Sequence, residues 1–82
     1  MRTLPLAGLT RMRQTAFRAL LAFLAREGRY PTGVELAEAL GRTPDATWAI
    51  LRALAREGLV ERHERRYALT QAGLELAAAL VA

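Results

Sequence analysis

A link of only three residues, Gly41-Arg42-Thr43, joins two segments with helical periodicity and leaves few ways to arrange them. The first segment starts at Thr32, and Glu35 three residues later completes the pattern of a capping box. The second starts after Thr43, a good N-cap, with Pro44 at the first helical position. Two helices joined by a tight glycine turn are typical of a helix-turn-helix motif.

Two further helices flank this motif. One is predicted from the N-cap Thr10 to Gly28, with an apolar stripe of Phe17, Leu20, Leu21 and Leu24 that Ala16 and Phe23 widen. The other begins at Thr70 and is apolar nearly all round, which indicates burial on more than one face. In a chain of 82 residues, a second subunit is the expected cover for that helix.

Between the motif and the last helix, the apolar period changes from that of a helix to that of a strand. Residues 59–63 and 66–69 are predicted to form two short strands around Glu64-Arg65. A hairpin directly after helix 44–57, whose inner face is Thr47, Ile50, Leu51 and Leu54, is typical of a wing. The fold class is therefore mainly α with a small β-hairpin, a winged helix-turn-helix. Its parts are an N-terminal leader (1–9), the winged helix-turn-helix domain (10–69) and a C-terminal helix (70–82).

The residue inventory argues against an enzyme. The chain has no Cys, Ser, Asn or Lys, one Asp (Asp45) and one His (His63). A Ser-His-Asp or Cys-His nucleophile cannot be assembled from these residues, and one His alone does not make a metal site of the usual kind. We expect no catalysis, no cofactor and no metal. No targeting segment or membrane span is visible, so the expected location is the cytoplasm.

The charge favours a nucleic-acid partner, although its distribution is uneven. The net charge is +4, and all twelve basic residues are arginine. Residues 1–31 carry six Arg and one Glu, and residues 59–69 carry three Arg and two Glu. Residues 32–58 carry three Arg and four acidic residues, so the segment of the helix-turn-helix is slightly acidic. That excess counts against a simple DNA-binding interpretation.

Three stretches resemble bacterial winged-helix regulators. Residues 30–41 are similar to their second helix, residues 51–62 to the passage from the third helix into the wing, and residues 67–73 to the exit from the wing in MarR-like and PadR-like repressors. Residues 9–61 also resemble the N-terminal DNA-binding domain of LexA. The resemblance implies a winged-helix fold that binds double-stranded DNA. The chain lacks the LexA peptidase domain and the extra helices of MarR-like proteins, so a ligand pocket is not expected.

The resemblance places the third helix in the major groove, with its outer face toward the bases. That face consists of Asp45, Trp48, Ala49, Arg52 and Arg56. Arg52 could bind a guanine edge, Ala49 a thymine methyl group and Asp45 a cytosine amino group. Trp48 has two interpretations: an apolar contact to DNA or to a protein partner, or a half-buried side chain packed on the second helix or on the leader.

Phosphate contacts are predicted at two places. Thr32, Arg42 and Thr43 lie at helix N-termini or in the turn between helices. Arg62, His63, Arg65 and Arg66 give the wing a basic tip, although any one of them could equally be a solvated surface residue.

Two functions follow from these observations. The first is a DNA-binding transcriptional regulator, a homodimer through its C-terminal helix, with recognition helix 44–57 in the major groove and basic wing 59–69 on the backbone. The second is a winged-helix protein-interaction module of a replication, transcription or phage assembly, with Trp48 as the contact. Salt separates them, because DNA binding weakens steeply as salt rises.

Overall fold

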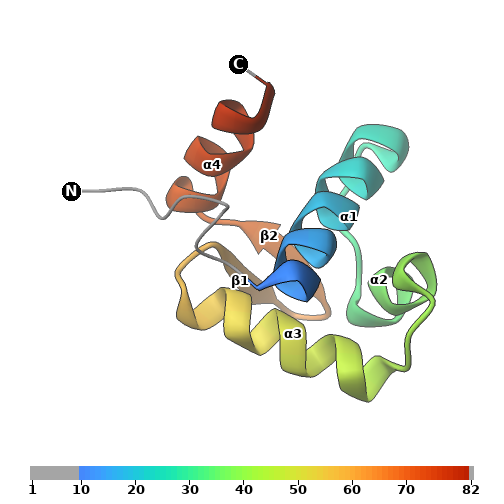
Figure 1. Ribbon diagram of the computed structural model, residues 1–82. Coiled ribbons are helices and arrows are strands. Elements are labelled where there is room, and N and C mark those ends of the chain that lie inside the picture. Colours follow the sequence, from blue (N-terminus) through green and yellow to red (C-terminus); the bar gives the residue numbers. More distant parts are fainter. Residues whose placement is uncertain (1–9, 82) are drawn as a thin grey trace.

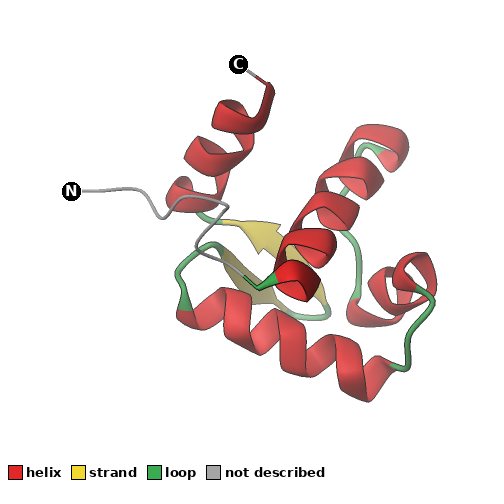
Figure 2. Ribbon diagram, in the orientation of Figure 1, coloured by secondary structure: helices red, strands yellow, loops and turns green. Residues whose placement is uncertain are grey.

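The computed structural model describes residues 10–81, which form four helices and one hairpin (Figures 1 and 2). The elements are α1 (Arg11–Glu27), α2 (Gly33–Leu40), α3 (Pro44–Arg56), β1 (Val60–His63), β2 (Arg66–Leu69) and α4 (Gln71–Val81). This order confirms the predicted mainly α fold with a two-stranded wing. The predicted leader, 1–9, lies outside the described residues. Within the described part, no helix is long and apolar enough to cross a membrane.

Threonine side chains cap all four helices, as the sequence predicts. Each threonine hydroxyl accepts a hydrogen bond from the backbone N–H three residues later, at Thr10, Thr32, Thr43 and Thr70. Helices α1 and α2 end at glycines in the left-handed conformation, with φ values of 72° and 68°. Helix α3 ends at Arg56, one residue before the predicted end at 57, and Gly58, with a φ of 79°, lies in the turn that follows.

The core lies where α1, α2 and α3 meet the hairpin. Its largest fully buried side chains include Phe17, Leu20, Leu36, Leu51, Leu54 and Leu59. On α1 the predicted stripe faces the core: Ala16, Phe17, Leu20 and Phe23 are buried, and Leu21 and Leu24 are partly buried and pack against the core. Helix α1 packs against both α2 and α3. On α3, Ala53 is more buried than Ile50.

The hairpin pairs Val60 with Leu69 and His63 with Arg66, which leaves Glu64-Arg65 as a two-residue turn. Leu59, predicted to belong to the first strand, precedes it. The base of the hairpin is buried through Val60, Tyr67 and Leu69, whereas every residue from 61 to 66 is exposed. The wing therefore has an anchored base and a solvent-exposed tip.

Helix α4 projects beyond the three-helix body (Figure 1) and is covered on one side. Leu76 is buried, whereas the Leu74 side chain is 47% exposed. Two bonds fix the start of the helix: the Thr70 N–H donates to the Leu59 carbonyl over 3.1 Å, and the Thr70 hydroxyl donates to the Gly58 carbonyl. The predicted burial of more than one face is not met within a single chain.

Candidate nucleic-acid interface

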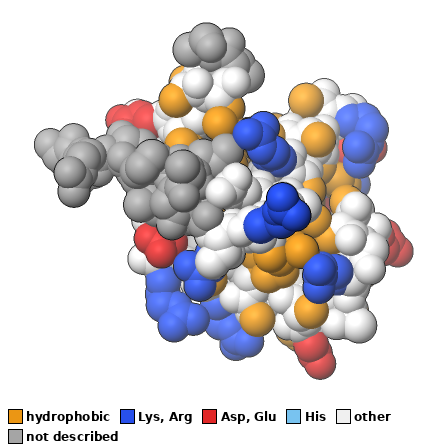
Figure 3. All heavy atoms as spheres, in the orientation of Figure 1, with side chains coloured by type: hydrophobic (Ala, Val, Ile, Leu, Met, Phe, Trp, Pro, Cys, Tyr) orange, Lys and Arg blue, Asp and Glu red, His pale blue; other side chains and the backbone are white. Residues whose placement is uncertain are grey.

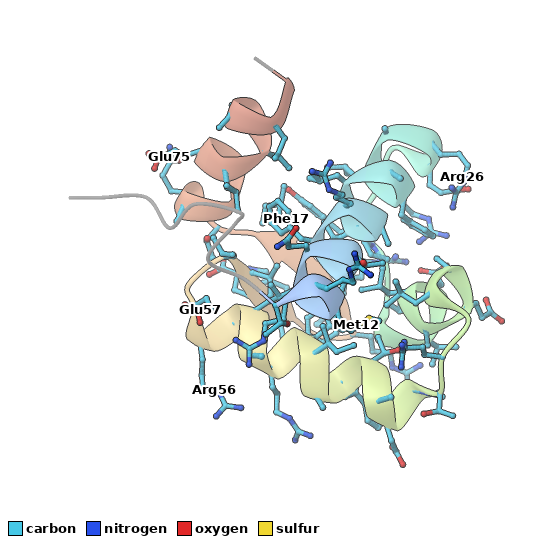
Figure 4. The ribbon with its side chains drawn as sticks, viewed as in Figure 1. Met12, Phe17, Arg26, Arg56, Glu57 and Glu75 are labelled. Carbon is cyan, nitrogen blue, oxygen red and sulfur yellow. The ribbon has the colours of Figure 1, made fainter. Side chains whose placement is uncertain are left out.

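Helix α3 turns one face to the core and the other to solvent. Thr47, Leu51 and Leu54 are fully buried, and the Thr47 hydroxyl is satisfied by donating to the Thr43 carbonyl over 3.0 Å. The predicted outer face is exposed throughout, at Asp45, Trp48, Ala49, Arg52 and Arg56. Arg56 points away from the core, in which Phe17 lies (Figure 4), and basic side chains gather over the C-terminal half of α3 at the lower left of Figure 3.

A groove of about 560 Å³ runs between α3, the start of α2 and the wing. Its lining residues are Thr32, Gly33, Val34, Trp48, Arg52, Arg62, Arg65 and Tyr67. Five of these were predicted from the sequence, namely Thr32, Trp48, Arg52, Arg62 and Arg65. Three arginines from two elements thus share one groove, and the floor between them is partly aromatic.

Gly33 and Trp48 meet at the floor of this groove. A Cβ built on Gly33 would lie 2.5 Å from the indole Nε1 and 3.0 Å from Cδ1, so the indole occupies the space that a side chain would need. Trp48 remains 43% exposed, and Val34 beside it is 53% exposed. The indole therefore packs on α2 with one edge and presents the rest to the groove.

At the N-terminus of α2, the Glu35 carboxylate is bonded to Arg29 and to the backbone of Thr32. The Glu35 carboxylate accepts two hydrogen bonds from Arg29, at 2.7 and 2.9 Å, and one from the Thr32 N–H at 2.9 Å. The Arg29 guanidinium first, and the Thr32 amide second, lower the pKa of Glu35 to about 2. Thr32, a predicted phosphate contact, thus has both its amide and its hydroxyl engaged in the capping box.

The four basic residues of the wing make different contacts. Arg62 donates from Nε to the Glu64 carbonyl over 2.7 Å, and His63 Nε2 lies 2.8 Å from Glu61 Oε1. Arg65 forms no ion pair with another described residue and lines the groove. Arg66 instead turns toward the body of the domain, where its Nη1 donates to the Tyr30 carbonyl over 2.8 Å.

Arg42 and Thr43 lie at the other end of α3 from the wing. Both are exposed, but neither lines the groove. Helix α3 has 13 residues, so its ends are about 20 Å apart at 1.5 Å per residue. Arg42 and Thr43 can therefore meet the same duplex only at a separate stretch of backbone.

Several residues that shape the interface were missed from the sequence. Gly33 and Tyr67 line the groove through contacts that join elements far apart in the chain, which no local pattern reports. Arg29 was missed because its partner, Glu35, was identified from the sequence only as part of a helix cap. Tyr30 was missed because its partner, Arg66, was expected at the wing tip. Val34 could have been found as an apolar residue on the outer side of α2.

Residues 18–61, more than half of the 82, match the model of a family described as winged helix-turn-helix DNA-binding. The chain therefore belongs to the winged helix-turn-helix DNA-binding family. This is a family of DNA-binding domains, not of enzymes, which confirms the prediction that the chain is no enzyme. No protein with a curated description is a significant match.

The solved structures that the chain resembles include those of MepR, a transcription regulator of the Staphylococcus aureus multidrug efflux pump MepA. One MepR structure is 27% identical with a TM-score of 0.73 and covers 92% of this chain and 56% of that chain. A mutant MepR from a multidrug-resistant S. aureus clinical isolate is 27% identical with a TM-score of 0.76, and the match covers 99% of this chain and 61% of that chain. The MepR chain of the S. aureus MepR–DNA complex is 26% identical with a TM-score of 0.70, and the match covers 92% of this chain and 56% of that chain. The chain thus spans about three fifths of MepR or less, and the predicted resemblance to winged-helix regulators is confirmed.

Proposed function

We propose that this chain is the DNA-reading part of a transcription regulator, with α3 in the major groove and the wing on the adjoining backbone. One observation carries the proposal: Arg52 of α3 and Arg62 and Arg65 of the wing line a single groove. The major groove of B-DNA, about 12 Å wide, admits an α-helix, and arginine binds both guanine edges and phosphates. A single duplex can therefore meet all three side chains at once.

The acidic residues among 32–58 should repel DNA less than their number suggests. Two of the four carboxylates have cationic partners within the fold: Glu35 is paired with Arg29, and Glu57 lies 3.5 Å from Arg13. Arg13 and Arg29 lie outside that segment. This pairing supports DNA binding, because it removes half of the charge that would repel phosphate.

For base recognition we propose three of the five exposed residues on the outer face of α3. Arg52 would donate to the two acceptors of a guanine edge, Ala49 would contact a thymine methyl group, and Asp45 would accept from a cytosine amino group. Arg42 and Thr43 would bind phosphate at the far end of α3, and Arg56 near its C-terminus.

We further propose that the regulator acts as a cytoplasmic homodimer that contacts DNA through two copies of α3. The 47% exposed Leu74 on α4, with Ala78 and Ala79 also exposed, is the surface we assign to the dimer. Similarity to MepR, a transcription regulator solved with DNA, supports the regulatory role. Analytical ultracentrifugation tests the dimer: association that Leu74→Glu abolishes supports it, and a monomer at high concentration refutes it.

The DNA-binding proposal is tested by fluorescence anisotropy on random-sequence duplex DNA over a salt series. The wing variant Arg62→Ala/Arg65→Ala should bind more weakly, and the slope of log K against log salt should fall by about 1.8, at about 0.9 for each phosphate contact. The control Arg18→Ala/Arg26→Ala removes the same charge from α1, where Arg26 lies far from Arg56 (Figure 4). We expect the control to retain the wild-type slope.

Absence of binding at low salt would refute the proposal. A specific observation then favours the second function, a protein-interaction module: Val34 and Trp48 are large apolar side chains, about half exposed, in the same groove. Docking through Trp48 would be nearly insensitive to salt and would be lost in Trp48→Ala.

A further inference from the structure

The wing tip needs an outside contact to hold its direction. Residues 61–66 are all exposed, so the tip has no core packing of its own. Two backbone contacts tie β2 to the segment before α2: a bridge between Thr32 and Arg66, and a hydrogen bond of 3.0 Å from the Tyr67 N–H to the Pro31 carbonyl. Both lie at the same end of β2, next to the turn that carries Arg65.

The Arg66 side chain reinforces this junction. Its Nη1 donates to the Tyr30 carbonyl over 2.8 Å and lies 3.7 Å from Glu35 Oε1. Glu35 is itself held by the paired hydrogen bonds from Arg29 and by the Thr32 amide. Arg66 therefore contacts a group that is already fixed at the start of α2, and a chain of charges links the segment between α1 and α2, α2 itself and the wing.

We propose that Glu35 and Arg66 are positioning residues for DNA binding, which hold the wing so that Arg62 and Arg65 face the groove of Arg52. The proposal rests on the proposed DNA-binding function. Arg66 does not line the groove that contains Arg52 and Trp48, and its Nη1 lies 3.7 Å from a carboxylate oxygen of Glu35. It acts on DNA through the placement of Arg62 and Arg65.

Glu35→Gln separates this role from a simple effect of charge. Removal of a carboxylate beside DNA should strengthen binding if electrostatics alone operate, because phosphate repulsion is reduced. Loss of the positioning contact should weaken binding instead. Glutamine in the third position of a helix still completes a capping box with Thr32, so α2 keeps its N-terminal cap. The two interpretations thus predict opposite signs.

The matched control is Glu38→Gln, which removes the same charge from an exposed position one turn further along α2. Salt-dependent anisotropy should show that Glu35→Gln weakens binding by about two- to fivefold, the range of a surface ion-pair contact, and lowers the salt slope toward that of the wing variant. Glu38→Gln should bind as tightly as wild type or slightly more tightly.

Arg66→Ala should resemble Glu35→Gln, and Arg66→Lys, which can still donate to the Tyr30 carbonyl, should restore part of the affinity.

Thermal unfolding, followed by circular dichroism, identifies a variant that merely folds poorly, because a smaller folded fraction lowers apparent affinity without changing the salt slope.

In the Arg62→Ala/Arg65→Ala background, Glu35→Gln should no longer weaken binding, since the side chains that Glu35 positions are gone. Tighter binding by Glu35→Gln, or an equal loss in both backgrounds, overturns the positioning role while the DNA-binding function stands. Failure of the wild-type protein to bind DNA refutes the proposed function itself.

Discussion

Gly73→Ala should destabilise the domain although alanine is the better helix former. Gly73 lies in the first turn of α4, which packs against the turn after α3. A Cβ at this position would overlap the Leu59 carbonyl oxygen and would lie 3.2 Å from the Leu59 carbonyl carbon. Those atoms are backbone, so no change of rotamer relieves the overlap, and the helix must move away.

The magnitude follows from what the movement disturbs. The 3.1 Å hydrogen bond from the Thr70 N–H to the Leu59 carbonyl is worth about 1 kcal/mol. Leu76 is 3% exposed, and losing half of the roughly 1.5–3 kcal/mol of its burial costs about 0.8–1.5 kcal/mol. Alanine returns about 1 kcal/mol through its helix propensity. The net expectation is a loss of about 0.8–1.5 kcal/mol and a Tm lower by roughly 3–12 °C.

Thermal unfolding monitored by circular dichroism measures this change. Ala22→Gly in the middle of α1 is the control: at this exposed position the propensity acts alone, so glycine should destabilise by up to about 1 kcal/mol. A Tm for Gly73→Ala at or above that of the wild type would show that α4 does not pack against the Leu59 carbonyl as described.

Three further predictions concern the wing and the groove. Glu64 has a φ of 59° and an exposed side chain, so Glu64→Gly should relieve strain and raise the free energy of unfolding by about 0.5–1 kcal/mol, measured by urea titration. Gly33→Ala should displace the indole of Trp48, the only tryptophan, and so shift its fluorescence and weaken DNA binding, while the Tm changes little because the indole is partly exposed; unchanged fluorescence would contradict the packing. The pKa of Glu35 is lowered to about 2 from 4.5, so its stabilising contribution is present above pH 4.5 and is lost as the pH falls toward 2. The Tm difference between wild type and Glu35→Gln should therefore shrink from pH 7 to pH 3, and a constant difference would contradict it.

Local signals in the sequence explain why the elements could be predicted well. The four threonine caps and the glycines after α1 and α2 are interactions within one helical turn, and all are present in the structure. The outer face of α3 was also predicted, because a helix with a buried Thr47, Leu51 and Leu54 has one possible exposed side.

Contacts between distant segments could not be predicted in the same way. The direction of the Arg66 side chain depends on its bond to the Tyr30 carbonyl, 36 positions earlier. The packing of Trp48 on Gly33 depends on how closely α2 approaches α3. The sequence placed Arg66 with the other wing cations because periodicity identifies which residues share a strand and not which neighbour a long side chain reaches.

The most direct test of DNA recognition is a titration of ¹⁵N-labelled protein with a short duplex, followed by amide chemical shifts. If DNA binds in the groove, the largest shifts should occur in residues 45–52 of α3, in 32–34 at the start of α2 and in 61–65 of the wing, with α1 between Arg18 and Arg26 nearly unchanged. If the largest shifts occur in α1 or α4 and the shifts of the groove residues do not change, the assignment of this groove as the DNA-binding surface is contradicted.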